Sequence, residues 1–291
     1  MPDFSNITLV SVTGLDHAQG AAYALELSAR RMAGARVVLF SPQCPAHLSP
    51  VTQYRAIAPM NYYEYSWFML FGLWRFIDTE YAIVVQDDGW VLDAANWRDE
   101  FLQYYYIGAT NHLAWVTSPS GSGWMGEFSW CSRLGQSDHV IMPVLNGGFS
   151  LRSRRMMRAL IDHPHIKYEL SPPDFVGGEP IEVRWLTYAQ NEDVQLTAVL
   201  RERLEGVGLR YPPLAVCQRF SLEFAGYHDG GTDPMQLFGH HCRWRRLVSI
   251  DPPTVRYSVP RSTMERAFRE TDVVQMLLRR GYRVEFATEP A

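Results

Sequence analysis

The sequence lacks any apolar run long enough for a membrane-spanning helix. Its most apolar stretch, Trp67 to Ile77, is short and contains Arg75, whereas a bilayer span needs about 20 apolar residues. The first residues also lack a basic segment followed by an apolar core, so no secretory signal is expected. We interpret the stretch as a buried helix in preference to an element on a membrane surface.

Cysteine is scarce, and its positions are far apart. Cys44, Cys131, Cys217 and Cys242 form no CxxC pair, so a thiolate zinc site is not expected. Free thiols are typical of a reducing compartment. The sequence therefore favours a cytoplasmic protein, either free in solution or against the inner face of a membrane.

The chain has no excess of positive charge. Its formal net charge is -4, and 47% of its residues are hydrophobic. This composition excludes wholesale disorder and argues against a nucleic-acid partner attracted by bulk charge. Arginines do gather at 152–158 and 243–246, so local anion binding stays open.

No GxGxxG motif is present, so a dinucleotide-binding fold gains no support. The segment Ile7–Val12 nevertheless reads as a strand, residues 18–32 as a helix and residues 36–40 as a second strand. This order is the βαβ unit of a parallel sheet. The turn after the first strand, with Thr13 and Gly14, is a candidate nucleotide contact.

Two adjacent carboxylates follow the most strand-like segment of the chain. Residues 82–85 are apolar and rich in β-branched side chains, and Asp87 and Asp88 come just after them. In open α/β sheets, ligands bind beyond the carboxyl ends of the strands. We therefore expect an α/β fold with a mostly parallel central sheet flanked by helices, and a ligand at these acids.

The remaining segments predict a main domain over residues 1–250 and a C-terminal helical appendage over 251–291. The stretch 119–136 reads as a loop with aromatics, which is either a lid over a ligand or a surface loop packed on the core. Helices are expected at 62–77, 96–105, 150–162, 189–204 and 263–280, and extended segments at 106–109, 140–144, 214–224 and 282–286.

Three polar groups are candidates for chemistry: Gln86-Asp87-Asp88, Glu192-Asp193 and His240-His241. Taken singly, the acids are explained by capping or the helix dipole, and the histidines by a surface or core position. Taken together, they suit a divalent cation, Mn²⁺ or Mg²⁺, because carboxylates bind both ions and imidazole suits Mn²⁺ better.

A series of sequence blocks resembles a known family. IVVQDDGWVL, YYYIGAT, LNGGFSLRSRRMM, NEDVQL, PPLAVCQRFSLE and FGHH occur in this order. The series resembles a bacterial family of the DUF5672 type, related to glycosyltransferases of the GT-A fold. The likeness covers roughly residues 7–243, and NGGFSLR is its most specific block.

The resemblance implies a metal and donor site at the strand-end acids. They look like the DXD motif, which binds a metal and the diphosphate of a nucleotide sugar, but Gln86 stands in place of the first acid. Asp88 is then the expected metal ligand and Asp87 a sugar or ribose contact. His241 is the expected third ligand, with His240 as the substitute.

The resemblance also implies an acceptor side. Asn146, Gly147 and Gly148 match the block that lines the sugars in β-1,4-galactosyltransferase-like enzymes. Glu192 and Asp193 match the acid pair beside the acceptor, with Asp193 as the base of an inverting reaction. The expected function is transfer from a nucleotide sugar, a UDP-sugar foremost, to a saccharide or other hydroxyl acceptor. A non-catalytic carbohydrate-binding protein and a metal-dependent phosphoester hydrolase remain the alternatives.

Overall fold

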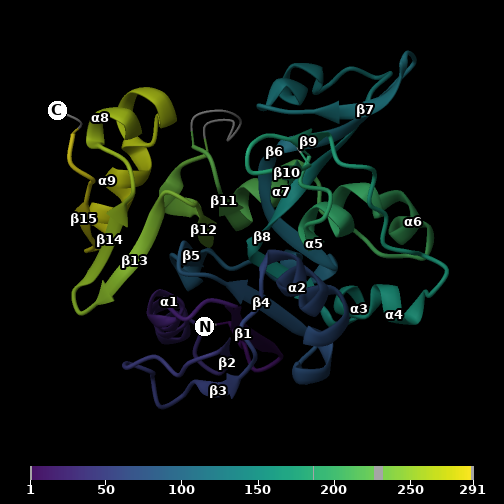
Figure 1. Cartoon of the computed structure of the whole chain (residues 1–291). Coiled ribbons are helices and arrows are strands. Elements are labelled where there is room, and N and C mark those ends of the chain that lie inside the picture. The colour runs from purple at the N-terminus through teal and green to yellow at the C-terminus, as the bar shows by residue number, and fades with distance from the viewer. Residues whose placement is uncertain (1, 186, 226–231, 290–291) are drawn as a thin grey trace.

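A seven-stranded mixed sheet runs through the molecule in the order β3-β2-β1-β4-β8-β6-β7 (Figure 1). The structure is a computed structural model that describes residues 2–185, 187–225 and 232–289. The strands are β1 Ile7–Val12, β2 Arg36–Ser41, β3 Gln53–Ala56, β4 Tyr81–Val85, β6 Tyr106–Ser118, β7 Gly121–Met125 and β8 Val140–Ser153.

Only half of this sheet is parallel. β1 pairs in parallel with β2 and β4, and β2 pairs in parallel with β3. β8 runs antiparallel to both β4 and β6, and β7 runs antiparallel to β6. The prediction of a mostly parallel sheet is therefore wrong for the second half. β6 and β7 are joined by residues 119–120 alone, so this pair has to be antiparallel, because parallel pairing requires a long crossover connection.

Helices cover the parallel half as the sequence predicts. α1 Gln19–Arg31 joins β1 to β2. The aromatic segment is a continuous helical stretch of α2 Tyr62–Trp67, the π-turn η1 Phe68–Gly72 and the 3₁₀-turn η2 Leu73–Phe76. Asn61 and Glu64 form a capping box at its start. Its inner face shares a core cluster with apolar side chains of β1, β2 and β4. Among the residues that the structure describes, none of the helices has the length and apolar character of a membrane span.

Several predicted elements differ from the structure. Residues 150–153 continue β8, and only α3 Arg154–Met157 and α4 Ala159–Asp162 are helical in the predicted helix 150–162. Residues 214–220 form α7 rather than a strand. The predicted loop 119–136 contains β7 and η5 Ser129–Arg133, and the predicted helix 96–105 is reduced to the short turns η3 Ala94–Asn96 and η4 Asp99–Gln103.

Smaller elements complete the main body. The predicted helix 189–204 is a broken helical run, α5 Glu192–Val194, η6 Gln195–Val199 and α6 Arg201–Gly206. Two small sheets flank the large one. Their strands are β5 Gly89–Val91, β11 Ser221–Leu222 and β12 Gly239–His241 in one, and β9 Phe175–Gly177 and β10 Glu182–Arg184 in the other; the turn η7 Pro234–Gln236 precedes β12.

The C-terminal segment, residues 251–289, reaches α1 and β5 through Tyr282, whose hydroxyl is hydrogen-bonded to Arg31 and to Trp90. The predicted boundary at residue 250 falls in the hairpin that joins β13 Arg245–Ile250 to β14 Pro253–Tyr257. The predicted helix 263–280 is interrupted at Arg269, whose φ is 54°. This segment holds strands as well as helices: α8 Arg261–Thr263, η8 Met264–Phe268, α9 Thr271–Arg279 and β15 Arg283–Glu285.

Candidate functional site

Strand register brings the strand-end acids Asp87 and Asp88 and the NGG block, residues 146–148, to the same end of the sheet. Val85, the last residue of β4, pairs with Phe149 of antiparallel β8. Residues 146–148 of β8 therefore lie beyond the end of β4, on the side where Asp87 and Asp88 follow. The two groups are far apart in the sequence, and the antiparallel pairing of β4 with β8 brings them close in space.

A bulge in β8 shapes this edge. Gly108 of β6 pairs with Ser150 of β8, and Thr110 pairs with Leu145. Between these two pairings β8 contains more residues than β6, which is a β-bulge. The side-chain oxygen of Asn146 accepts hydrogen bonds from the backbone N–H groups of Gly148, at 2.7 Å, and Phe149, at 3.2 Å. Bulges of this kind re-aim side chains next to functional sites.

Gly148 is required for a close approach of two polar side chains. A Cβ atom at this position would lie 2.4 Å from Nε2 of His241 and 2.6 Å from Oε1 of Gln86. Neither contact is sterically allowed. Gly148 thus makes room for the imidazole of His241. From the sequence alone, Gly148 was expected only to line the sugar site.

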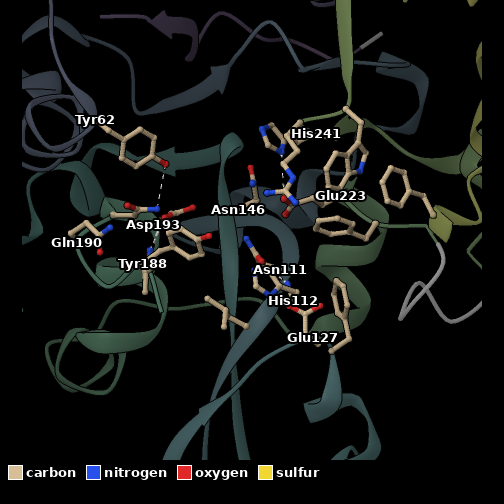
Figure 2. Close-up of a pocket in the computed structure, with 18 residues that line it drawn as sticks. Tyr62, Asn111, His112, Glu127, Asn146, Tyr188, Gln190, Asp193, Glu223 and His241 are labelled. Carbon is tan, nitrogen blue, oxygen red and sulfur yellow. Dashed lines mark hydrogen bonds and ion pairs between the residues drawn. The ribbon is translucent and has the colours of Figure 1, made fainter. Parts of the chain in front are cut away.

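A cavity of about 740 Å³ opens beside the bulge, and we call it the acid cavity (Figure 2). Figure 2 shows Asp193, Asn146, Glu223 and His241 around it. Buried Oε1 of Gln190, Oδ1 of Asn191 and Oε2 of Glu223 have no hydrogen-bond partner among the described residues. Aromatic side chains form another part of its wall: Phe128, Phe224, Trp244 and Phe268.

Asp193 lines the acid cavity, and backbone hydrogen bonds hold both oxygens of its carboxylate. Its oxygens accept hydrogen bonds from the backbone N–H groups of Gly147, at 3.0 Å, and Val194, at 2.8 Å. Burial, together with the neighbouring charge of Glu192, raises the pKa of Asp193 to about 7. A carboxylate with such a pKa is suited to exchange a proton near neutral pH.

Glu192, the other predicted catalytic acid, lies in a buried ion pair instead of facing the acid cavity. It forms a buried ion pair with Arg152, with 2.9 Å between Oε1 and the guanidinium, and the two side chains are 3% and 1% exposed. Arg152 also donates to the carbonyl of Gly147. Glu192 is absent from the lining of the acid cavity, and the pair instead holds the NGG backbone in place.

A second cavity of about 350 Å³ lies at the ends of β1 and β4, and we call it the strand-end cavity. Thr13, Gly14, Asp87 and Asp88, the residues that the sequence suggested as donor contacts at the strand ends, all line it. Asp88 thus lines a different cavity from Asn146 and Asp193. Tyr62 lines both, so the two cavities adjoin across one side chain.

An ion pair between Asp88 and His241 also links the cavities. Nε2 of His241 lies 3.2 Å from Oδ1 of Asp88, and its Nδ1 lies 3.7 Å from Oε1 of Glu223. Burial opposes the charge on the imidazole, but the two carboxylates raise the pKa of His241 to about 10. Burial likewise opposes ionisation of Asp88, yet the imidazolium outweighs it and lowers the pKa of Asp88.

The other strand-end side chains are held separately. Asp87 forms an ion pair with Arg246. Burial and the adjacent Asp88 raise the pKa of Asp87, and Arg246 opposes that shift. The amide of Gln86 donates a hydrogen bond of 3.0 Å to the hydroxyl of Tyr65.

His240 lies apart from the site, contrary to the suggestion that it substitutes for His241. It is fully buried and packs edge-on against Trp90, with 4.1 Å between ring centroids. Successive side chains of a strand face opposite sides, so His240 points into the core, whereas His241 points to the acid cavity. In the described part of the chain, no group of three or more His, Cys, Asp or Glu side chains is placed to hold a metal ion.

Sequence reasoning gave no site role to Tyr62 and Glu223, and it noted Arg152 and Arg246 only as members of basic runs open to anion binding. Glu223 ends the block PPLAVCQRFSLE, and Arg246 lies in a recognised basic run. The residues next to Glu223 and Arg246 in the sequence do not indicate that these side chains pair with His241 and Asp87. Tyr62 showed only as the first ring of an aromatic helix.

Comparison with known families matches residues 60–237 to the model described as protein of unknown function (DUF5672). The matched stretch is more than half of the 291 residues and carries Asp88, Asn146 and Asp193. The chain belongs to the DUF5672 family. A comparison with curated proteins gives no match for this DUF5672 chain.

Proposed function

We propose that this DUF5672 protein transfers a sugar from a nucleotide sugar to a hydroxyl acceptor. The observation that carries the proposal is the meeting of two cavities at Tyr62. One contains the strand-end acids, and the other contains a buried carboxylate whose pKa lies near neutrality. A donor diphosphate and an acceptor hydroxyl could then meet at the junction.

In the proposed reaction, the acceptor oxygen attacks the anomeric carbon of the donor sugar. The bond from that carbon to the diphosphate breaks, and the nucleoside diphosphate leaves with the electron pair. Asp193 takes the hydroxyl proton, and its fixed oxygens would aim it at the acceptor. Inversion at the anomeric carbon follows from the resemblance to β-1,4-galactosyltransferase-like enzymes.

The donor would bind with its diphosphate near Asp88, His241 and Arg246. A divalent ion, Mn²⁺ or Mg²⁺, would be held by Asp88 and His241 once His241 gave up the proton that its two carboxylate partners stabilise, and it would then neutralise the diphosphate charge. The two side chains are 3.2 Å apart, and phosphate oxygens and water commonly complete such a coordination sphere. Arg246 supplies a protein cation beside the same acids.

The acceptor would bind in the acid cavity. The unpartnered oxygens of Gln190, Asn191 and Glu223 suit the hydroxyl groups of a saccharide, because those groups donate hydrogen bonds. The aromatic part of the wall would pack on the apolar face of a sugar ring. A GT-A relationship accords with the βαβ start of the sheet and with acids beyond the end of β4.

Release of nucleoside diphosphate tests this proposal. Purified protein would be incubated with UDP-, GDP- and dTDP-sugars, each of which carries a diphosphate, with and without Mn²⁺, and with saccharide acceptors. We expect one donor to raise the melting temperature, because ligand binding stabilises the folded state, and to release its diphosphate only when Asp193 is intact. Diphosphate release by Asp193→Asn at the native rate would refute the assignment of the base.

A non-catalytic carbohydrate-binding role is the second candidate. Two observations favour it: Gln86 stands in place of an acid at the strand end, and both oxygens of Asp193 already accept backbone hydrogen bonds. Saccharide binding without turnover of any donor would support this alternative.

A further inference from the structure

Gly147 lies where three polar side chains of the site converge. A Cβ atom at this position would lie 2.8 Å from Oε1 of Glu192, 3.0 Å from Nη2 of Arg152 and 3.1 Å from Cβ of Asp193. A methyl group there would displace the carboxylate of Glu192. The first glycine of the NGG block therefore lets these three side chains meet at one point of the backbone.

The backbone of Gly147 connects Arg152 to Asp193. Its carbonyl oxygen accepts hydrogen bonds from Nη2 of Arg152, at 3.2 Å, and from the hydroxyl of Ser150, at 3.0 Å. Its N–H donates the 3.0 Å hydrogen bond that holds one carboxylate oxygen of Asp193. A glycine backbone has no Cβ to restrict its rotation, so these hydrogen bonds set the direction in which the N–H points.

Arg152 is itself fixed by several acceptors. Its side chain is 1% exposed. Besides the Gly147 carbonyl, its guanidinium donates to the carboxylate of Glu192, at 2.9 Å, and to the hydroxyls of Ser150, at 3.0 Å, and Tyr106, at 3.3 Å. A guanidinium carries five N–H groups in a fixed plane, whereas the ammonium of lysine is a compact charge with three. Lysine would therefore keep the charge at this position but not the same set of contacts.

We propose that Arg152 is a positioning residue for Asp193. Through the backbone of Gly147 it fixes the orientation in which the Asp193 carboxylate meets the acceptor hydroxyl, and Glu192 in turn fixes Arg152. Arg152 is absent from the described lining of the acid cavity, so it acts through Asp193 and not on a bound substrate. The catalytic consequence rests on the proposed function, but the hydrogen bonds and charges around Asp193 can be measured without any substrate.

The ion pair of Arg152 with Glu192 also acts on the charge of Asp193. Burial and the carboxylates of Glu192 and Glu223 favour the protonated form of Asp193, whereas the guanidinium of Arg152 favours its ionised form. Burial and the charge of Asp193 itself raise the pKa of the two nearby hydroxyls, so that they stay neutral: Tyr62 and Tyr106. Neutralising Glu192 alone should therefore lower the pKa of Asp193, which the loss of a merely structural ion pair would not do.

NMR titration of Glu192→Gln tests the effect of charge, because the variant keeps a carbonyl oxygen for Arg152 and removes the negative charge. Aspartate carboxyls are labelled with ¹³C, no ligand is present, and the Asp193 signal is assigned by its loss in Asp193→Asn. This signal should titrate about one pH unit below the native midpoint of about 7. Glu205→Gln is the matched control, because Glu205 forms a more exposed pair with Arg201, and it should titrate like the native chain. Equal midpoints in the native chain and in Glu192→Gln would overturn the effect of the pair on Asp193.

Arg152→Lys tests the effect of geometry. Because the Gly147 amide proton is hydrogen-bonded to Asp193, its ¹H shift should follow the Asp193 titration in the native chain and lose most of that pH dependence in the variant. Diphosphate release should show kcat lowered by about tenfold or more at an unchanged KM, because a misaligned base slows only the chemical step. Arg158→Lys, in an exposed pair with Asp162, is the control and should match the native chain. A native amide titration together with a native kcat in Arg152→Lys would overturn the proposal.

Circular dichroism melts verify that each variant folds. If Arg152→Lys does not fold, Ser150→Ala takes its place, because it removes the other donor to the Gly147 carbonyl; an unchanged amide titration in that variant would count against the proposal. Absence of diphosphate release from every donor would refute the proposed function and leave the NMR results standing. Native-like NMR titrations in the variants of a protein that does release diphosphate would refute only the positioning role.

Discussion

At the scale of single residues, Asp193 and Glu192 are sequence neighbours with opposite environments. Asp193 faces the acid cavity, and burial raises its pKa to about 7. Because a base must be ionised, we expect kcat/KM to rise with pH through about 7. Asp193→Asn should lower kcat by about 10²- to 10⁴-fold, the usual contribution of general-base catalysis, and abolish that rise. A pH–rate profile of both proteins measures this, and an unchanged rise in the variant would assign it to another group.

Glu192 should matter for stability instead. Removing one partner of a buried ion pair leaves the other charge uncompensated, so Glu192→Ala should cost about 3–5 kcal/mol in the free energy of unfolding. Urea denaturation measures the loss. Glu205→Ala is the control, because it breaks the more exposed pair with Arg201, which is worth about 1 kcal/mol or less. Equal losses in the two variants would contradict the structural role of Glu192.

The sequence could predict residues that carry a motif but not their partners. Asp87, Asp88, Asn146 and Asp193 stand in recognisable blocks, and each lines one of the two cavities. Arg152, whose guanidinium neutralises Glu192, and Glu223, the carboxylate beside His241, also stand in such blocks, but the blocks do not say which residues they contact. Their positions depend on packing between distant parts of the chain, which no local pattern encodes.

At the scale of elements, the bulged part of β8 tolerates little change. Gly148→Ala would drive a methyl group against His241 and Gln86, so we expect a loss of about 1–3 kcal/mol, typical of overpacking. Gly123→Ala in β7 is the control, because a Cβ there meets no atom within 4 Å. Thermal melts compare the two, and a stable Gly148→Ala protein would show that the imidazole moves freely.

Elements with local signals were predicted, and elements formed by distant pairing were not. β1 was predicted with its observed ends, Ile7–Val12, because its apolar run is bounded by turn residues. The antiparallel strand β8 was mistaken for a helix after residue 150. Its basic residues suit a helix surface, yet Arg152 is buried in the strand because Glu192 neutralises it. Tertiary pairing here overrides local propensity.

At the scale of the whole molecule, the C-terminal segment contributes to the main core. Val273 and Leu277 of α9 belong to the same hydrophobic cluster as Leu25 of α1. The hydroxyl of Tyr282 accepts a hydrogen bond of 2.8 Å from the buried indole of Trp90. Phe268 also lines the acid cavity. The sequence predicted a boundary after residue 250, but the pattern of local segments does not reveal a shared core.

Deletion of residues 251–291 should therefore abolish cooperative folding. The shortened chain would lose the partners of β13 and uncover the apolar surfaces of α1 and β5. We expect no sigmoidal thermal transition by circular dichroism and an expanded, aggregation-prone species by light scattering. A chain ending at Glu289 is the control, because it keeps every strand and helix described here. A cooperative melt of the chain ending at Ile250, close to that of the control, would mean that residues 1–250 fold independently.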